Sequence, residues 1–190
     1  TDTATLPLVH MEAFRNRSTG TATYYSYRIE GAFHRIIRHG NSPLNYWWEV
    51  IDKQGTRYFY GKYSTDVGFN DLCGLKGANG IAHWALAEVR DVHGNYVRYE
   101  YDLEVCSTQS PAFGGKQLTP KKIIYTSHAS LQGIYNVEFV SNNTSEYTVS
   151  GKYGFLEYNN KLLDNIVVRH GNEFIRTYAF MYKEGAYKKK

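Results

Sequence analysis

The sequence predicts an all-β protein built mainly from antiparallel, twisted sheets of successive hairpins, arranged as a sandwich or as an open shell segment. Apolar and polar residues alternate with period two in many short stretches, whereas the three-and-four spacing of amphipathic helices is almost absent. Turn-forming Gly, Asn and Asp residues recur between these stretches. Aromatic residues make up 16% of the chain and are mostly Tyr, which suits half-exposed sheet surfaces because its ring packs while its hydroxyl reaches water.

The alternating stretches place the expected strands along the whole chain. They cover residues 33–38, 56–60, 97–101, 123–126, 135–140, 147–149, 162–169 and 174–183. Two Gly-rich stretches, 61–80 and 107–120, interrupt this rhythm and are expected to be loops.

The chain length of 190 residues fits one all-β domain, 1–190. The alternative is a subdivision into 1–106 and 121–190, joined by the Gly- and Pro-rich loop between them. The sequence begins with neither Met nor a hydrophobic leader, so we expect it to be a segment of a longer polypeptide.

The tripeptide His-Gly-Asn occurs three times, each time between strand-like runs. Tight hairpins need residues with positive φ, which Gly adopts freely and Asn tolerates. We therefore predict turns at these three places, and interpret the three preceding His residues as bystanders. The predicted turn residues are Gly40, Asn41, Gly94, Asn95, Gly171 and Asn172.

A second pattern, Asp-x-x-Gly, occurs as Asp52 to Gly55 and again 39 residues later as Asp91 to Gly94. It suits a type I turn in which Asp accepts backbone hydrogen bonds and Gly takes the left-handed conformation. Each Asp follows a Glu by three residues, Glu49 and Glu88. These carboxylate pairs could serve acid and base chemistry in a glycosidase, but their identical placement beside turns favours a structural role.

The sequence contains no pattern typical of a catalytic, metal or cofactor site. The seven His residues are scattered, and Cys73 and Cys106 have no Cys-x-x-Cys or Cys/His ligand spacing, so they could pair or stay reduced. There is no Gly-x-Ser-x-Gly elbow, and the Gly-rich stretch 74–80 lacks the spacing of a phosphate-binding loop. We therefore expect no catalytic residue, bound metal or cofactor.

The net charge of +4 owes three of its charges to the terminal residues 188–190. A nucleic-acid site needs basic residues spread over a folded surface, so we expect no nucleic-acid partner. No apolar run approaches the roughly 20 residues of a membrane span.

Aromatic residues gather around Trp47, Trp48 and Tyr58. They could form a sugar-binding surface, but core and cross-strand packing explains the same residues.

Three segments in a fixed order resemble the amino-terminal region of the virulence-plasmid B protein and the B component of insecticidal Tc toxins, relatives of the Rhs/YD-repeat proteins. The segments are Glu30–Ile37, Tyr46–Gly61 with its Trp pair and DKQGTRYFYG turn, and Trp84–Tyr101 with its Asp-x-x-Gly-Asn hairpin. The likeness covers Tyr27 to Tyr187 and continues through Ile123–Thr126, Tyr135–Phe139, Leu162–Ile166 and Arg176–Tyr182.

The resemblance implies a non-enzymatic segment of a secreted, extracellular bacterial toxin, part of a β-rich shell that encloses a toxic polypeptide. Its implied partners are other segments of the same toxin polypeptide or assembly. The chain is short for that family, since it lacks the long run of YD repeats and a C-terminal effector domain. The alternative hypothesis is an extracellular carbohydrate-binding or adhesion module that uses the aromatic surface.

Overall fold

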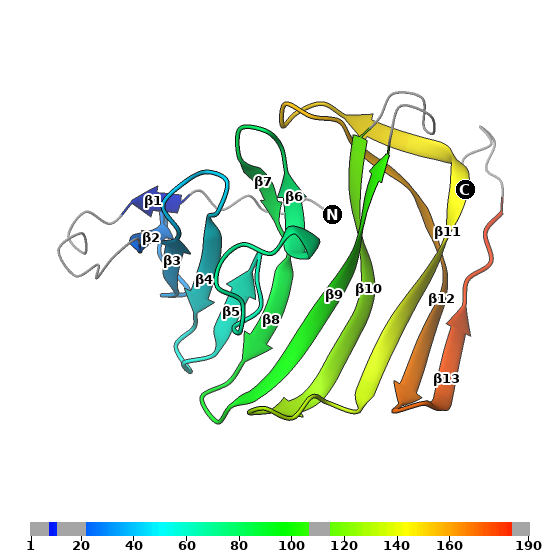
Figure 1. Cartoon of the computed structure of the whole chain (residues 1–190). Coiled ribbons are helices and arrows are strands. Elements are labelled where there is room, and N and C mark those ends of the chain that lie inside the picture. The colour runs from blue at the N-terminus through cyan, green and yellow to red at the C-terminus, as the bar shows by residue number, and fades with distance from the viewer. Residues whose placement is uncertain (1–7, 11–21, 107–114, 184–190) are drawn as a thin grey trace. The chain divides into compact units, whose positions relative to one another are not determined.

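The chain folds into strands joined by turns, which confirms the all-β, mainly antiparallel prediction (Figure 1). The computed structural model describes residues 8–10, 22–106 and 115–183. In these ranges the one helix is a short 3-10 turn, η2 (Asp71–Cys73). No helix in the described ranges has the length and hydrophobicity that a membrane crossing needs.

The backbone divides into two compact units, Thr1–Tyr96 and Val97–Lys190. This division lies inside strand β9 (Asn95–Cys106), whereas the sequence suggested a subdivision across residues 107–120. Residues 107–114 lie outside the described ranges, and residues 115–120 are not a loop but the first part of strand β10. Pro120 at an exposed position of that strand hid the strand pattern.

Unit 1 contains a sheet of antiparallel neighbours in the order β1-β2-β3-β4-β5-β8. Its strands are β1 (Leu8–His10), β2 (Thr23–Tyr27), β3 (Arg35–His39), β4 (Trp47–Ile51), β5 (Arg57–Tyr60) and β8 (Leu86–Arg90). Strand β3 begins two residues later than expected because Phe33 has a positive φ of 54°, which interrupts the extended backbone just before the strand.

The stretch 61–80, expected to be a loop throughout, contains a short strand of its own. Strand β6 (Gly74–Lys76) pairs with β7 (Ile81–Trp84) as a separate two-stranded sheet. Gly74 is needed there because a Cβ at this position would lie 2.2 Å from the backbone oxygen of His83. Gly74 is therefore present because the strands pack closely there. The glycine content of the stretch had instead suggested a flexible loop.

Unit 2 contains a sheet in the order β9-β10-β11-β12-β13 (Figure 1). The strands after β9 are β10 (Gly115–His128), β11 (Tyr135–Ser150), β12 (Glu157–His170) and β13 (Glu173–Ala179). The stretches 135–140 and 147–149, expected as separate strands, belong to the single strand β11. Register shifts after Val140 and between Asn143 and Thr148 break its alternation, which is why the sequence pattern splits it.

Each unit has its own small core. In unit 1 the most deeply buried apolar residues include Ile36, Ile37, Phe59, Leu75 and Ala87. In unit 2 they are Ile124, Tyr158 and Val167. Unit 1 also buries two carboxylates and one lysine, Glu49, Glu88 and Lys62. Charged side chains are rarely buried unless they are paired, so these three residues are a candidate functional site.

Candidate functional site

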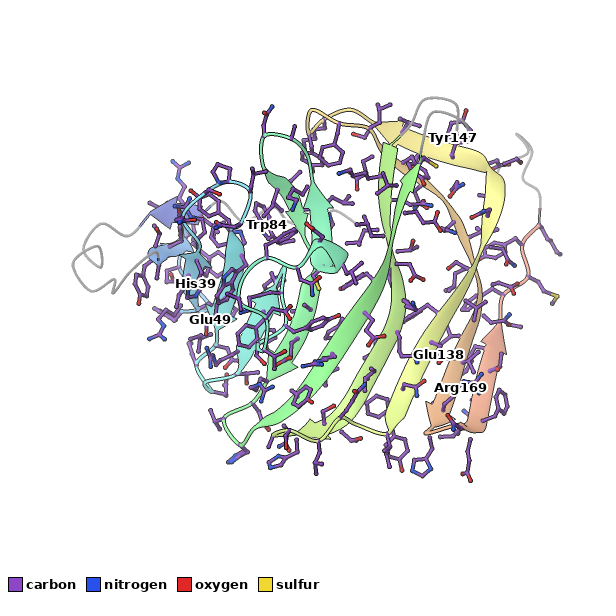
Figure 2. The ribbon with its side chains drawn as sticks, in the orientation of Figure 1. His39, Glu49, Trp84, Glu138, Tyr147 and Arg169 are labelled. Carbon is purple, nitrogen blue, oxygen red and sulfur yellow. The ribbon has the colours of Figure 1, made fainter. Side chains whose placement is uncertain are left out.

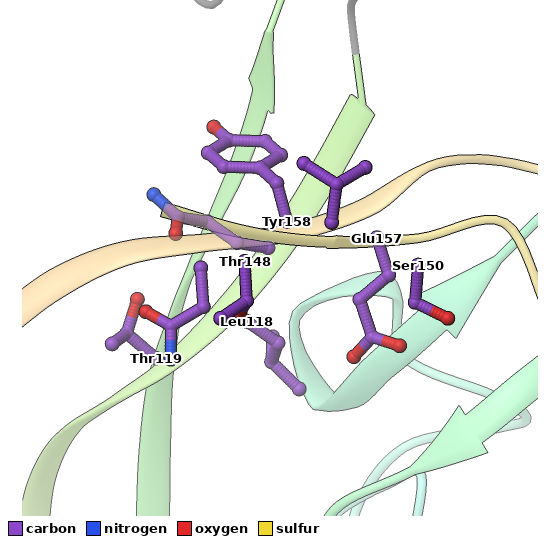
Figure 3. Close-up of a pocket in the computed structure, with 9 residues that line it drawn as sticks. Leu118, Thr119, Thr148, Ser150, Glu157 and Tyr158 are labelled. Atoms are coloured by element: carbon purple, nitrogen blue, oxygen red, sulfur yellow. The ribbon is translucent and has the colours of Figure 1, made fainter. Parts of the chain in front are cut away.

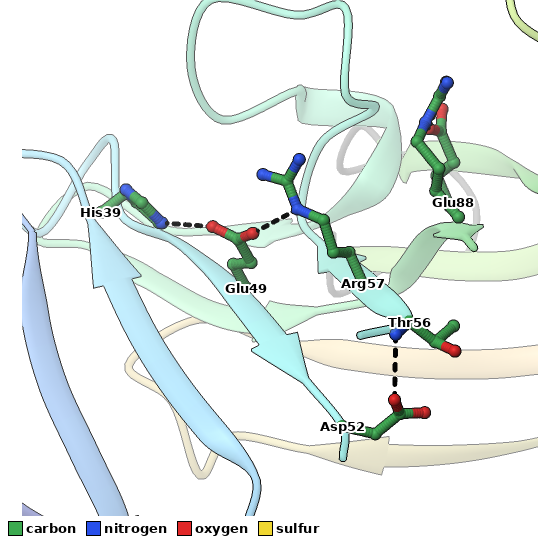
Figure 4. Close-up of polar contacts among 7 residues, drawn as sticks. His39, Glu49, Asp52, Thr56, Arg57 and Glu88 are labelled. Atoms are coloured by element: carbon green, nitrogen blue, oxygen red, sulfur yellow. Dashed lines mark hydrogen bonds and ion pairs between the residues drawn. The ribbon is translucent and has the colours of Figure 1, made fainter. Parts of the chain in front are cut away.

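A cluster of charged side chains lies on one face of the unit 1 sheet. Side chains alternate between the two faces of a strand, and the strand registers place His39, Glu49, Arg57, Glu88 and Arg90 on the same face. Together with Lys62, which follows β5, these residues are called the charged cluster below. Figure 4 shows His39, Glu49 and Arg57 converging from β3, β4 and β5.

Glu49 is the centre of one half of the charged cluster. Its side chain is buried, with 4% of the residue exposed. Its Oε2 lies 2.9 Å from His39 Nε2, and its Oε1 accepts a 2.6 Å hydrogen bond from Arg57 Nε. The His39 ring stacks on Trp47 with 3.8 Å between ring centroids and an interplanar angle of 7°.

Glu88 is the centre of the other half and is fully buried. It accepts a hydrogen bond from Arg90 Nε at 3.0 Å, and the same guanidinium donates to the Ser64 hydroxyl at 3.0 Å. Arg57 and Arg90 are directly opposite each other in the β5–β8 register, a destabilising pairing of like charges. The two carboxylates beside them offset this repulsion.

Lys62 is the third cation of the cluster and is also buried, with 5% exposed. Its Nζ donates to the backbone oxygen of Asp66 and lies 4.4 Å from the centroid of the Trp47 ring. Burial lowers the pKa of this ammonium group, and the negative charges of Asp66, Glu49 and Glu88 limit the decrease. A buried lysine of lowered pKa is a common feature of catalytic sites, so its partners decide how it is interpreted.

The carboxylates of the charged cluster are held by neighbouring cations. Burial raises the pKa of Glu49, but hydrogen bonds and positive charge from His39 and Arg57 outweigh it, so the pKa is lowered overall. A general acid needs a raised pKa, and the environment of Glu49 has the opposite effect. No group of three or more His, Cys, Asp or Glu side chains in the described ranges could hold a metal ion.

The two Asp-x-x-Gly segments form equivalent turns next to this cluster. Asp52 Oδ1 accepts from the backbone N–H groups of Gln54 and Thr56, both at 2.9 Å. Asp91 Oδ1 accepts from the corresponding groups of His93 at 2.9 Å and Asn95 at 2.8 Å.

Gly55 and Gly94 both have positive φ, 85° and 88°. The pKa of Asp91 is lowered, chiefly by the hydrogen bond from the Asn95 side chain. The pKa of Asp52 is lowered too, because backbone hydrogen bonds outweigh its desolvation.

The two other His-Gly-Asn segments form different connections. Gly40 has a φ of 99° and begins the longer connection from β3 to β4, where Asn45 Oδ1 accepts from the N–H groups of Asn41 and Ser42. Gly171, with a φ of 56°, and Asn172 form the two-residue connection between His170 and Glu173. Positive φ falls on glycine in each case, and neither Asn41 nor Asn172 is among the non-glycine residues with positive φ.

The three His residues that precede these glycines are not alike. His93 contributes only its backbone N–H to the turn. His39 contacts Glu49 and Trp47, so the interpretation of this residue as a bystander needs correction. His170 packs against Tyr135 with 4.7 Å between ring centroids. The difference follows from position, because His39 and His170 are the last residues of their strands whereas His93 lies inside its turn.

Trp47, Trp48 and Tyr58, grouped as one surface by the sequence, do not share a face. Trp47 lies with Glu49 and Phe59, and Trp48 and Tyr58 lie on the opposite face, because neighbouring residues of a strand alternate. Trp48 lines an apolar hollow of about 420 Å³. The other lining residues are Leu8, Tyr27, Ile36, Val50, Tyr60 and Trp84. The expected row of three rings for sugar stacking is therefore not formed.

Unit 2 has a buried polar group of a different kind. Gln117 is buried and donates through Nε2 to Glu104 Oε2 at 2.6 Å and to Asn160 Oδ1 at 2.8 Å. Next to it, burial and the neighbouring Cys106 raise the pKa of the Tyr158 hydroxyl. Cys73 and Cys106 do not form a disulfide with each other in the structure.

Sequence reasoning missed the cluster residues Lys62, Arg57, Arg90 and His39. Their proximity depends on strand register, which residue types do not reveal. One sequence signal could have indicated part of the cluster: in both Asp-x-x-Gly segments a Glu stands three residues before the turn Asp. The two Glu residues therefore occupy equivalent positions in the strands that lead into the two turns. Both of these glutamates are buried.

The fold and the charged cluster together define an all-β module whose buried charges hold one another and whose turns are fixed by Asp and Gly. The family described as Salmonella virulence plasmid 65kDa B protein matches residues 8–171. The chain therefore belongs to this family of bacterial virulence proteins. A comparison with curated protein sequences gives no match.

Solved structures share the fold at low sequence identity. The N-terminal domain of the effector protein SpvB from Salmonella typhimurium strain LT2 is 17% identical with a TM-score of 0.66, over 90% of this chain and 61% of that one. The crystal structure of TcdB2-TccC3-TEV is 13% identical with a TM-score of 0.62, over 86% of this chain and 10% of that one. A Photorhabdus luminescens Tc holotoxin pore is 14% identical with a TM-score of 0.62, over 78% of this chain and 9% of that one.

Proposed function

We propose that the chain is a non-enzymatic structural segment of a secreted bacterial toxin, and that it forms part of a β-rich shell around a toxic polypeptide. Its family and its fold support this proposal. In the TcdB2-TccC3-TEV structure the matching region is 10% of a much longer chain, so the same fold occurs there as one part of a large polypeptide. The proposed partners are other segments of the same toxin, and the proposed location is outside the bacterial cell.

The observation that carries the proposal is the outer strand of the unit 2 sheet, β13. All seven of its residues are exposed, and within the described ranges it pairs on one side only, with β12. Large apolar side chains, including Phe174, Ile175 and Tyr178, are exposed along it. Edge strands that face water are often protected by Lys, Pro or shortness, and β13 has none of these, although Glu173, Arg176 and a bulge at Ile175 shield part of it.

The part of β13 most suited to a further strand is Arg176 to Ala179. A register shift next to Val168 makes Ile175 an extra residue, after which pairing with β12 is regular. Arg176 lies over the ring of Tyr178, 5.9 Å from its centroid, so its stem covers an aromatic surface. We infer that a strand from another segment of the toxin continues the sheet here.

The charged cluster supports the non-enzymatic part of the proposal. Glu49 and Glu88 are held by Arg57, His39 and Arg90. For Glu49, the hydrogen bonds and positive charge of His39 and Arg57 lower the pKa and favour the ionised form, which does not suit a general acid.

Hydrogen exchange on the isolated chain and on the longer toxin polypeptide tests the role of the edge. The outward amides of residues 176–179 should exchange fast in the isolated chain and at least roughly tenfold slower in the longer polypeptide. Equal exchange in both would contradict the proposal. Ile175→Lys should increase protease access to the enclosed polypeptide, whereas Leu131→Lys, an exposed turn position away from the edge, should not.

A separate measurement addresses catalysis. Glu49→Gln and Glu88→Gln in the longer polypeptide should reduce toxicity only in proportion to the loss of folded protein. A loss of toxicity at full folded yield would indicate that the cluster reacts with a substrate.

A further inference from the structure

The backbone hydrogen bonds on either side of β12 fix which groups of β13 face its free edge. The N–H of Phe180 donates to the backbone oxygen of Asp164 at 2.9 Å, and these two residues continue the β12–β13 register. On the other side, the N–H of Gly171 donates to the backbone oxygen of Ile134 at 2.6 Å, in register with β11. Hydrogen-bonded residues alternate along an antiparallel ladder, so the odd-numbered residues in 165–169 bond to β11 and the even-numbered ones bond to β13.

The free edge of β13 therefore offers the backbone groups of Thr177 and Ala179, whereas those of Arg176 and Tyr178 bond to β12. A further strand that continues the antiparallel order of β11, β12 and β13 forms its hydrogen-bonded pairs with Thr177 and Ala179. Its residues opposite Arg176 and Tyr178 then occupy non-hydrogen-bonded positions, where the Cα atoms are only about 4.5 Å apart. The side chains of Arg176 and Tyr178 therefore decide which strand fits.

Tyr178 ends an apolar row that crosses three strands. Phe139 on β11 is opposite Ile166 on β12, and Ile166 is opposite Tyr178. Directly opposed residues lie on the same face of a sheet, whereas neighbours in one strand lie on opposite faces, as Glu157 and Tyr158 of β12 do in Figure 3. Tyr178 is 49% exposed, so an apolar residue opposite it on a further strand would extend the row and cover the ring.

Arg176 lies on the same face as Tyr178, two residues away. Its Nη1 donates to Tyr178 Oη at 3.3 Å, which uses one of the five N–H donors of the guanidinium. Within the described ranges no Asp or Glu forms an ion pair with Arg176, and the acid of the same strand, Glu173, lies 3.8 Å from His170 instead. Opposite charges stabilise directly opposed positions of a sheet and like charges destabilise them. The position opposite Arg176 therefore favours a carboxylate.

We propose that the strand that continues the sheet at β13 carries an acidic residue opposite Arg176 and an apolar residue opposite Tyr178. In an antiparallel strand the apolar residue precedes the acidic residue by two positions, and the residue between them forms a hydrogen-bonded pair with Thr177. This inference rests on the proposed function, because it gives the chemistry of the strand that the shell role requires.

Amide exchange in the longer toxin polypeptide tests the acidic position. Arg176→Glu should speed the exchange of the Thr177 and Ala179 amides roughly threefold to tenfold, because repulsion replaces attraction across the new pair. Arg176→Lys keeps the charge and should retain the wild-type rates. The Tyr178 amide, which bonds to β12, should stay protected in both variants and so shows that β13 remains paired.

A zero-length carbodiimide cross-link identifies the acidic residue itself. In the Arg176→Lys variant of the longer polypeptide, the introduced amine should form an amide with a carboxylate outside residues 1–190. Mass spectrometry should locate this carboxylate two residues after an apolar residue. The wild type should lack the cross-link, because a guanidinium does not react with the activated carboxylate.

The matched control is Lys152→Glu, the same charge reversal at an exposed turn position between β11 and β12. It should leave the exchange of Thr177 and Ala179 unchanged. Equal exchange in the wild type and Arg176→Glu, or cross-links confined to Glu173 and other acids of residues 1–190, would overturn the inference. The shell role would still stand if both amides exchange more slowly in the longer polypeptide than in the isolated chain. Without that slowing, the shell role and the inference fail together.

Discussion

Replacing Glu49 by Gln should destabilise unit 1 by about 2 kcal/mol. The substitution keeps the shape of the side chain but removes the charge that two neighbouring groups share. A lost hydrogen bond to a charged group costs roughly 1.5–3 kcal/mol, and an exposed partner reduces that cost. The Arg57 side chain is 47% exposed and can turn to water, whereas His39 is 24% exposed and stacked on Trp47, so most of the loss arises at His39.

Urea unfolding followed by tryptophan fluorescence measures this loss in unit 1. All three tryptophans, Trp47, Trp48 and Trp84, precede the division at Tyr96, so their signal reports on that unit. The midpoint should decrease at an unchanged slope.

The matched control is Glu138→Gln in unit 2, where a half-exposed glutamate is held by Lys122 and Arg169 (Figure 2). It should cost less than about 1 kcal/mol and leave the tryptophan transition unchanged. A Glu49→Gln effect below about 0.5 kcal/mol would refute the reasoning, because it would mean that the buried carboxylate contributes nothing as an ion.

The dependence on pH gives a second check on Glu49. Its pKa in the folded protein is below the ordinary value of 4.5, so the unfolded chain binds a proton more readily. The stabilisation is therefore complete above pH 4.5 and is lost as the pH falls through the folded pKa. Glu49→Gln should flatten the stability curve in that acid range, and an unchanged acid slope would count against the assignment.

Four further substitutions test the turn at Gly94, the buried lysine and the close backbone contact at Gly133. Gly94→Val should cost more than about 2 kcal/mol in urea unfolding because it forces a β-branched residue to positive φ, whereas His93→Ala should be nearly neutral; similar losses would contradict the turn interpretation. Lys62→Met should remove the gain in stability that the wild type shows as the pH rises toward 10.5, since the folded state favours the neutral amine; an identical alkaline profile would argue against burial. Gly133→Ala should lower the yield of folded unit 2, because the new Cβ would lie 1.8 Å from the backbone carbonyl oxygen of Tyr125. A normal yield and an unchanged thermal stability of this variant would refute the predicted clash.

Much of the fold could be predicted because alternation is a local property. Whether a residue lies in a strand can be inferred from the polarity of the residues two positions away on either side. This holds for the stretches around Ile36 and Ile37 and around Tyr99. Strand β10 escaped notice at its start because Pro120 and the nearby glycines dominate the composition there. Strand β6 escaped notice because it is only three residues long.

The candidate sites were less predictable because they depend on register. Nothing near Lys62 in the sequence indicates that it is buried close to Glu49 and Glu88. The grouping of Trp47 with Trp48 failed for an elementary reason, since adjacent residues of a strand point to opposite faces.

The fixed interval between each buried glutamate and its turn aspartate limits how the chain can change length. One residue inserted between Glu49 and Asp52 would turn the Glu49 carboxylate to the opposite face of the sheet. Arg57 would then lose its negatively charged partner. The connection from β3 to β4 carries no buried carboxylate, and it is exposed at Asn41 and Leu44, although Pro43 accepts a backbone hydrogen bond from Ile81. Insertions and deletions in relatives should therefore accumulate in that connection and spare the two Glu-to-Asp intervals.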